Sequence, residues 1–349
     1  LELDKITAIN PEIISRQATI NIGTIGHVAH GKSTLVRAIS TINTVRHYDE
    51  KFRNITIKLG YANAKLYQCP TCPAPECFKS FSSSKDDKVN CTNADCKSEL
   101  ILQRHVSFVD CPGHDTLMAT MLAGAAVMDA ALLLVAANQG YPQPQTREHL
   151  IAVSIMEMQH IIVVQNKIDI ILSSGDKNQA KRQQEEIDKS LGNNKWPIIP
   201  ISAQLKYNID AVIDYICRIP IPPRDYTCAP EMIVIRSFDV NKPGNECEKI
   251  NGGVAGGTIL KGVLKVGDEI AIRPGYVRRS STGTSKWKEI RSQVVTLKAD
   301  QNNLMYAVPG GLIAVGTRVD PQFTRSDNMV GMIVGKPDAM PSVFIEIDV

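Results

Sequence analysis

The sequence contains no run of about 18 uncharged apolar residues, which is the length that a membrane-spanning helix needs. Its longest apolar region, from Met121 to Ala137, is interrupted by Asp129 and fits a helix followed by a strand better than a single span. The chain also begins at Leu1, without a Met or an apolar signal region. We therefore expect no membrane span, and we expect that the N-terminus has been trimmed.

A strong charge of either sign is also absent. The 349 residues carry a formal net charge of +3, and this mild basic excess permits a nucleic-acid partner without requiring one. The content of 43% hydrophobic and 21% charged residues is typical of a soluble globular protein. Because a chain of this length is too long for a single core, we expect two or more domains.

The sequence does not indicate a framework of disulfides either. Its nine cysteines are an odd number, and five of them lie between Cys69 and Cys96. Such clustering is typical of metal binding, or of free thiols in a reducing compartment, rather than of a secreted disulfide scaffold. We therefore expect a cytoplasmic protein.

What the sequence does contain is a phosphate-binding loop. It reads Gly26-His27-Val28-Ala29-His30-Gly31-Lys32-Ser33-Thr34, which is the pattern Gly, four residues, Gly, Lys, Ser. A β-branched stretch before it predicts a strand, and helical apolar spacing after it predicts a helix. The loop amides and the helix N-terminus would bind a triphosphate, Lys32 would reach its β and γ oxygens, and Ser33 would bind Mg²⁺. A chance match is the alternative for this pattern taken alone.

The polar segment from Thr41 to Arg53 separates that helix from the sequence Asn54-Ile55-Thr56-Ile57-Lys58. Few groups hold such a segment in place, so a bound γ-phosphate and Mg²⁺ would order it and hydrolysis would release it. Thr56 is the natural second hydroxyl for the metal. The alternative is an ordinary solvent loop followed by an edge strand.

A strand predicted over 106–110 ends in Asp110-Cys111-Pro112-Gly113-His114. An Asp at a strand end beside the phosphate loop can hold a Mg²⁺ water, and the Gly113 amide can bond the γ-phosphate. His114 would stand where a Gln orients the attacking water in small GTPases, so it is the candidate catalytic residue. The alternative is a structural or solvated histidine.

Two further predicted strands, over 161–165 and 197–201, end in Asn166-Lys167-Ile168-Asp169 and in Ser202-Ala203-Gln204. The Asp169 carboxylate can accept from guanine N1–H and from the exocyclic amine. Adenine would leave that charge unpaired, and sites of this kind discriminate by about 10⁴ or more. Lys167 can lie along the base, Asn166 can tie this loop to the phosphate loop, and the Ala203 amide can reach guanine O6. These residues predict a guanine-nucleotide site.

The cysteine cluster offers two pairs, in Cys69-Pro70-Thr71-Cys72 and in Cys91-Thr92-Asn93-Ala94-Asp95-Cys96. Both spacings suit a tetrahedral thiolate site, which can stabilise an insertion too small and polar to bury a core. The sequence therefore predicts one structural Zn²⁺ held by Cys69, Cys72, Cys91 and Cys96. Cys77 could substitute for one ligand, and surface thiols without metal are the alternative.

Proline density over 219–224 predicts a domain boundary. Short β-branched segments beyond it, separated by Gly, Pro, Asn and Asp, predict a β-barrel; they cover 231–240, 256–261, 269–274, 291–297 and 313–317. We expect long loops over 243–253 and 277–286. The second loop is either a basic surface for a polyanion or a solvated hairpin tip.

The predicted fold is an α/β P-loop GTPase domain, a mostly parallel sheet with helices on both faces, followed by an all-β barrel domain. The expected boundaries are a lead-in over 1–16, the GTP-binding domain over 17–222, its zinc-knuckle insertion over 66–100, the barrel over 223–340, and the start of a third domain over 341–349. The last seven residues, 343–349, have the alternation of a strand.

The motifs GHVAHGKS, NITIK, DCPGH, NKID and SAQ, in this order, resemble those of the translational GTPases. The stretches RNITIKLGYANAKLYQC and RHVSFVDCPGHDTLMATML, with the cysteine-rich insertion, are similar to the gamma-subunit family of eukaryotic and archaeal translation initiation factor 2. This resemblance covers residues 17–349 and implies hydrolysis of GTP to GDP with Mg²⁺. In that family a third barrel follows, and only its first strand or linker is expected here.

The resemblance also implies partners. They are the alpha and beta subunits of a heterotrimer, methionyl initiator tRNA, the small ribosomal subunit, and GTPase-activating and nucleotide-exchange factors, with no membrane. One departure is Ala29, where elongation factors commonly have an Asp that can help to hold a cation, so intrinsic hydrolysis is expected to be altered. Val28 and Ile55 look like the apolar pair that flanks the catalytic His in relatives.

Two other functions fit the same motifs. A selenocysteine-specific elongation factor shares the motifs and the barrel, although the cysteine insertion argues against it. A nucleotide-gated scaffold that binds only protein partners is the second alternative.

Overall fold

The computed structural model describes residues 6–44, 50, 56–86, 88–174, 178–191, 195–242, 244, 246, 250–279 and 285–344. The chain divides into two compact units, Pro11–Pro222 and Leu1–Asn10 together with Pro223–Val349. Among the described residues, none of the helices combines the length and the apolar character needed to cross a bilayer.

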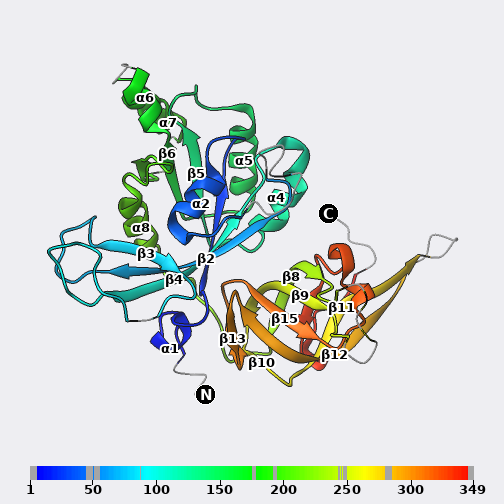
Figure 1. The fold of residues 1–349 in the computed structure, drawn as a ribbon. Coiled ribbons are helices and arrows are strands. Elements are labelled where there is room, and N and C mark those ends of the chain that lie inside the picture. Colours follow the sequence, from blue (N-terminus) through cyan, green and yellow to red (C-terminus); the bar gives the residue numbers. More distant parts are fainter. Residues whose placement is uncertain are drawn as a thin grey trace. The chain divides into compact units, whose positions relative to one another are not determined.

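A seven-stranded sheet forms the centre of unit Pro11–Pro222 (Figure 1). Its strands are β1 (Ile20–Ile25), β2 (Gly60–Gln68), β3 (Phe78–Ser82), β4 (Ile101–Asp110), β5 (Ala130–Ala136), β6 (Ile161–Asn166) and β7 (Ile198–Pro200), in the order β3-β2-β4-β1-β5-β6-β7. Neighbouring strands in the series β4-β1-β5-β6-β7 pair in parallel. Strand β2 pairs antiparallel with both β3 and β4. Every residue of β1, β5 and β6 is buried, which explains why β5 is entirely apolar and why β1 and β6 are mostly apolar.

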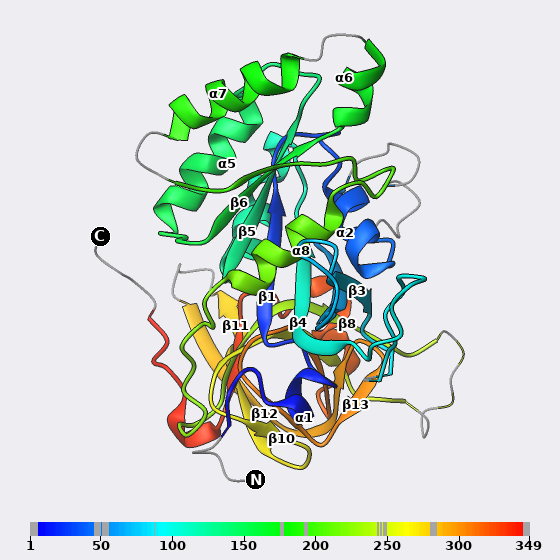
Figure 2. The same cartoon turned by 90° about the vertical axis from the view of Figure 1, so that its left-hand side faces the viewer.

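Helices cover both faces of this sheet (Figure 2). They are α1 (Pro11–Ile14), α2 (Lys32–Ser40), α4 (Met118–Ala125), α5 (Pro144–Ile155), α6 (Ile168–Ser174), α7 (Gln179–Leu191) and α8 (Ile209–Arg218). Alternate residues of β5 point to opposite faces: Leu132 and Leu134 pack with α2 and α8, whereas Leu133 and Val135 pack with α5 and α7. Two separate hydrophobic cores therefore fix the sheet between its helices.

The parallel pairing brings the loops after β1, β4 and β6 to the same edge of the sheet. Thr24 near the end of β1 lies opposite Asp110 at the end of β4, and Ala136 at the end of β5 lies opposite Asn166 at the end of β6. Ligands of open parallel sheets bind at the carboxyl ends of their strands. The predicted phosphate, metal and base motifs therefore meet at one place.

Unit Pro223–Val349 with Leu1–Asn10 is a closed antiparallel barrel. Its strands are β8 (Glu231–Phe238), β9 (Val254–Lys261), β10 (Leu264–Lys265), β11 (Glu269–Arg279), β12 (Ser285–Ala299), β13 (Asn302–Leu304), β14 (Tyr306–Ala307), β15 (Ile313–Thr317) and β16 (Ile333–Gly335), with short turns η4 (Pro321–Phe323), η5 (Arg325–Asp327) and η6 (Pro337–Ala339). The order β11-β16-β8-β9-β15-β12-β13 is closed by pairing of β11 with β12. The predicted fold class, a GTPase sheet followed by an all-β barrel, is confirmed.

One predicted loop is wrong. The sequence predicted a long loop over 277–286, but β11 continues to Arg279 and β12 begins at Ser285. The polar and charged side chains there gave no apolar pattern from which the strands could be predicted. Backbone pairing can nevertheless continue where no core lies beneath it. The loop predicted over 243–253 and the strand over 343–349 lie partly outside the described residues, and the described Val343 and Phe344 belong to no strand.

Candidate functional site

The phosphate-binding loop connects the end of β1 to the start of α2. Gly26 and Gly31 have φ of 133° and 93°, in the region that favours glycine. A Cβ at Gly26 would collide with the Leu134 carbonyl, and one at Gly31 would collide with the side-chain nitrogen of Asn166. Both glycines are therefore required by backbone conformation and by close packing, as the motif predicts. Ala29, with φ of 62°, is a non-glycine residue in the same left-handed region.

Lys32 lies under this loop rather than in solvent. Its Nζ donates to the carbonyls of Gly26 and His27, at 2.8 Å each. Burial lowers the pKa of Lys32 to about 8, although nearby Asp110 acts in the opposite direction. A Cβ at Gly113 would collide with Lys32 Nζ, so the Asp110–His114 motif lies directly against the phosphate loop. The ammonium and the Gly113 backbone are therefore close enough to act on the same phosphate.

The two hydroxyls predicted to bind Mg²⁺ are adjacent. Ser33 Oγ lies 3.1 Å from Thr56 Oγ1. Neighbouring oxygens of an octahedral Mg²⁺ site are about 2.9 Å apart, so this pair fits two cis ligands. Glu50, which sequence reasoning missed, holds this segment by accepting from the N–H groups of Ile57 and Lys58 at 3.1 and 3.0 Å.

Asp110 is fully buried, and threonines hold both of its oxygens. Oδ1 accepts from Thr24 Oγ1 at 3.0 Å, and Oδ2 accepts from Thr44 Oγ1 at 2.5 Å. Each carboxylate oxygen has further lone pairs, so these bonds leave capacity for a metal-bound water. Its role as a Mg²⁺ partner stays a prediction, and the contacts of Thr24 and Thr44 fix its orientation.

His114 follows β4 and lies half-buried just before the turn η2 (Asp115–Leu117). Its Nδ1 accepts from the backbone N–H of Thr116 at 3.3 Å and lies 2.9 Å from Thr116 Oγ1. Because a backbone N–H can only donate, the neutral ring carries its proton on Nε2. Burial, then the charges of Lys32 and His114, lower the pKa of His27, so His114 is within electrostatic reach of the phosphate loop. Ile55, predicted to flank His114, lies outside the described residues.

Asn166 connects three loops of the site. Its Nδ2 donates to the His30 carbonyl at 2.9 Å, and its Oδ1 accepts from Ala203 N–H at 3.0 Å. The predicted tie between the base loop and the phosphate loop is therefore present in the structure. The Ala203 N–H was predicted to reach guanine O6; it donates to Asn166 here, and the contact to O6 stays a prediction.

The remaining base-binding candidates lie around Asn166. Lys167 has φ of 68°, and half-buried Asp169 lies in the first turn of α6. Buried Ser202 accepts at Oγ from Leu205 N–H at 3.3 Å, which shapes the loop that contains Ala203 and Gln204. The structure thus brings Asn166, Lys167, Asp169 and 202–204 to the carboxyl ends of β6 and β7.

Two buried histidines fix the position of the phosphate loop. His149 on α5 accepts at Nδ1 from Gly26 N–H at 3.0 Å, and His30 makes contacts of 2.9 and 3.0 Å with Leu134 O and Gln139 Oε1. Burial lowers the pKa of both histidines to about 4, so both rings are neutral at physiological pH. Sequence reasoning missed His149, because nothing in its own segment indicates that it reaches β1.

The four predicted zinc ligands form one cluster. The Sγ atoms of Cys69, Cys72, Cys91 and Cys96 all lie within 4.8 Å of one another. The distances Cys69–Cys96 and Cys72–Cys91 are 3.6 and 3.8 Å. A tetrahedron with Zn–S bonds of about 2.3 Å has edges of about 3.8 Å, so the thiols fit a Zn²⁺ ion.

Neighbouring groups shift the pKa values of the cluster's thiols in both directions: a hydrogen bond with Cys69, followed by burial, raises the pKa of Cys72 to about 12. Hydrogen bonds from the Thr71 hydroxyl, and then from its backbone, lower the pKa of Cys69 to about 6. Cys77 is buried and stays outside the cluster, while its carbonyl accepts from Cys69 N–H at 2.8 Å. Cys77 therefore supports the backbone of the cluster and is not required as a ligand.

Comparisons with known proteins agree with this geometry. The family model of the elongation factor Tu GTP binding domain matches residues 17–221. The chain is 59% identical over 355 residues to "Eukaryotic translation initiation factor 2 subunit 3" of Drosophila melanogaster, covering 100% of this chain and 74% of that protein. It is 56% identical over 352 residues to "Eukaryotic translation initiation factor 2 subunit gamma" of Schizosaccharomyces pombe, covering 100% and 78%.

Solved structures share the fold at lower identity. A bacterial selenocysteine-specific elongation factor has a TM-score of 0.67 at 23% identity, over 92% of this chain and 45% of that one. Elongation factor SelB of Methanococcus maripaludis, solved with the GTP analogue GppNHp, has a TM-score of 0.65 at 22% identity, over 93% and 56%. This chain thus spans about half of each solved chain, and the likeness shows the fold alone.

The cysteine cluster predicts one zinc per chain. Elemental analysis of protein purified reduced and without chelators should find about one Zn²⁺, because four thiolates complete a tetrahedral site. Cys72→Ser should lose the metal and the buried Cys77→Ser should retain it. Metal-free wild-type protein, or zinc loss in Cys77→Ser alone, would contradict the assignment.

The two buried histidines predict that the free energy of unfolding decreases in acid. Their pKa of about 4 lies below the ordinary value of 6.5, so the unfolded chain takes up protons first and stability falls as pH drops from 6.5 towards 4. Each of these pKa shifts corresponds to a loss of about 3 kcal/mol in the free energy of unfolding once the pH is below about 4. In urea unfolding with GDP present, the double variant His30→Gln/His149→Gln should lose less stability over this range than wild type, whereas His160→Gln should behave as wild type. An unchanged loss of stability in acid in the double variant argues against this origin.

Proposed function

The chain belongs to the translational GTPases and, within them, to the gamma-subunit family of translation initiation factor 2, and from this premise we propose that it carries methionyl initiator tRNA to the small ribosomal subunit in its GTP-bound state. Membership of this family makes the chain a GTPase of a translation initiation factor. The cargo, the ribosomal target and the residue roles below are our proposal. The observation that supports them most is the meeting of five separate motifs at one sheet edge.

The proposed site binds the phosphates and the metal through groups that are already oriented. The amides of the phosphate loop and the Lys32 ammonium bind the β and γ oxygens. Ser33, Thr56 and, through water, Asp110 would hold Mg²⁺, which neutralises charge on the phosphates when bound. Gly113 would contact the γ-phosphate, since its backbone lies against Lys32.

Hydrolysis proceeds by in-line attack of water on the γ-phosphorus. The new P–O bond forms with the water oxygen, the bond to the β–γ bridging oxygen breaks, and the water protons end on the phosphate products. Because Nδ1 of His114 accepts from Thr116 N–H, the neutral ring carries its donor hydrogen on Nε2. We therefore assign His114 the role of orienting the water by donation, rather than of abstracting its proton.

The partners in this proposal follow the names of the relatives. Both are named as subunits of initiation factor 2, which supports a complex with alpha and beta subunits. A switch of this kind also needs GTPase-activating and nucleotide-exchange factors. One Zn²⁺ would stabilise the cysteine-rich insertion without a chemical role.

The selenocysteine-specific alternative is disfavoured by sequence. Identities of 23% and 22% to such elongation factors contrast with 59% and 56% to initiation factor subunits over the whole chain. The deciding experiment is retention of methionyl initiator tRNA against elongator tRNA with GTP, GDP and no nucleotide. GTP-dependent retention of the initiator alone supports the proposal. Retention that is equal with GTP, GDP and no nucleotide overturns the GTP-gated delivery, and no retention of either tRNA favours the protein-binding scaffold.

Replacement of Asp169 should change the base that is selected. Asp169→Asn should weaken GTP binding and gain binding of xanthosine triphosphate, because the C2 carbonyl of xanthine replaces the donor amine of guanine. Fluorescent-nucleotide titration measures both affinities, and the exposed Asp188→Asn is the matched control. Unchanged GTP affinity in Asp169→Asn would show that guanine is recognised by another group.

Replacement of His114 should separate binding from chemistry. His114→Ala should keep GTP affinity within a few-fold and lose about 10² or more of activator-stimulated hydrolysis, since the histidine acts mainly when water attacks. Lys32→Ala should instead lose nucleotide binding. Single-turnover hydrolysis with the ribosome and activating protein is the measurement, and a wild-type rate in His114→Ala would leave His114 only a packing role.

A further inference from the structure

The chain around Thr56 is held in place without secondary structure of its own. Residues 56–59 belong to neither a helix nor a strand, and β2 begins only at Gly60. Thr56 Oγ1 nevertheless lies 3.1 Å from Ser33 Oγ in the first turn of α2, close to the spacing of two neighbouring metal ligands. Contacts to other segments therefore fix it, because backbone outside a helix or a sheet is ordinarily among the least stable parts of a protein.

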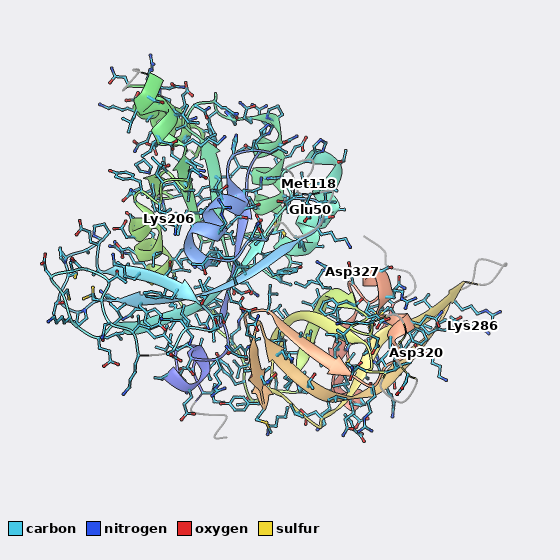
Figure 3. All side chains as sticks on the ribbon, viewed as in Figure 1. Glu50, Met118, Lys206, Lys286, Asp320 and Asp327 are labelled. Carbon is cyan, nitrogen blue, oxygen red and sulfur yellow. The ribbon has the colours of Figure 1, made fainter. Side chains whose placement is uncertain are left out.

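Glu50 provides such a contact. Its Oε1 accepts from the backbone N–H groups of Ile57 at 3.1 Å and of Lys58 at 3.0 Å, and the residue is only 2% exposed. Figure 3 labels Glu50, which in that view lies near α4. Two successive N–H groups that converge on one anionic oxygen form a backbone anion site, and a side chain of the same protein fills it here. The two peptide groups directly after Thr56 are therefore fixed by a single carboxylate.

The charge of Glu50 matters as well as its shape. A buried carboxylate costs free energy unless hydrogen bonds compensate it, and bonds to an ionised acceptor are about twice as strong as neutral ones. A glutamine has the same length and a carbonyl oxygen that can accept from both N–H groups, but it would hold them less strongly. An alanine would release them. Substitutions at this one position therefore weaken the contact in two steps.

The hydroxyl that Glu50 holds in place is the one that depends on the nucleotide state. In the proposed function Ser33 binds Mg²⁺ at the phosphate loop, whereas segments such as the one that contains Thr56 contact the metal when a γ-phosphate is present. GDP has no γ-phosphate, so fixing Thr56 in advance favours the complex with GTP. A group that is ordered before binding loses less conformational entropy when the metal arrives.

We propose that Glu50 is a positioning residue that holds Thr56 ready for Mg²⁺ and thereby raises the preference of this chain for GTP over GDP. In this role Glu50 contacts neither the nucleotide nor the metal, because its Oε1 acts through the backbone of Ile57 and Lys58. The inference rests on the proposed function, namely on Thr56 as a metal ligand. It deepens that function by naming the residue that prepares the ligand and the nucleotide that is favoured.

The test is the affinity of the whole chain for fluorescent GDP and for a fluorescent non-hydrolysable GTP analogue, at one fixed Mg²⁺ concentration. Glu50→Ala should bind the GTP analogue about 10-fold more weakly and GDP within about 2-fold of wild type, because two charge-assisted hydrogen bonds behind Thr56 are lost. Glu50→Gln should lose about 3-fold or less. The control Glu148→Ala removes an exposed glutamate of α5 and should bind both nucleotides like wild type. An equal loss for both nucleotides in Glu50→Ala, or no loss, overturns the proposal.

The metal gives a second readout. The Mg²⁺ concentration that half-saturates the complex with the GTP analogue should rise about 10-fold in Glu50→Ala and in Thr56→Val, and the value for the GDP complex should stay within about 2-fold of wild type. The double variant Glu50→Ala/Thr56→Val should be no weaker than Thr56→Val alone, since Glu50 acts through Thr56. Additive losses in the double variant would show that Glu50 acts elsewhere and would overturn this role.

The same variants separate this inference from the proposed function. If Thr56→Val weakens binding of the GTP analogue and Glu50→Ala does not, Thr56 remains a metal ligand and only the role of Glu50 is overturned. If Thr56→Val changes neither affinity, the assignment of Thr56 in the proposed function fails, and this inference fails with it. A loss in Glu50→Gln as large as in Glu50→Ala overturns the positioning role in favour of Glu50 as a direct metal ligand. GDP affinity like that of wild type shows that each variant is folded.

Discussion

The parallel pairing of β1 with β4 and β5 is the constraint on which the nucleotide site depends. It places Thr24 beside Asp110 and brings the ends of β1, β4 and β6 to one edge. Motifs that are more than a hundred residues apart in the sequence, such as Gly31 and Asn166, then come into contact. A shift of one residue in this register would turn alternate side chains to the wrong face and separate Asp110 from its threonine partners.

Buried polar groups convert this arrangement into a rigid site. Asn166 uses both ends of its amide, and His149 uses Nδ1, to hold backbone groups that would otherwise be buried without a partner. Losing one such partner costs about 1 to 3 kcal/mol, which is large against the net stability of a domain. The phosphate loop is therefore held by the sheet and by α5 as well as by its own glycines.

The sequence was most informative where function depends on local chain geometry. Gly31, Lys32 and Ser33 are recognisable because a loop that ends at a helix N-terminus needs those residue types in that order. The cysteine pairs are recognisable because a tetrahedral thiolate site needs pairs of cysteines at short spacing on two turns. His149, Thr44 and Glu50 were not, because each acts on a segment to which only the tertiary fold brings it. The continuation of β11 to Arg279 and the start of β12 at Ser285 were missed because polar and charged residues interrupt the apolar pattern of a strand there.

The residues proposed for binding and the residue proposed for catalysis are held in different ways. Lys32, Asp110 and Asn166 are buried and each makes two hydrogen bonds, so their positions are fixed by the core. His114 is half-buried, and its ring nitrogen accepts from Thr116, only two residues further along the chain. These hydrogen bonds of Lys32, Asp110 and Asn166 do not involve His114. In the function proposed above, the contacts to the nucleotide are therefore fixed by the core before the water is oriented, and binding and hydrolysis depend on different residues of one fold.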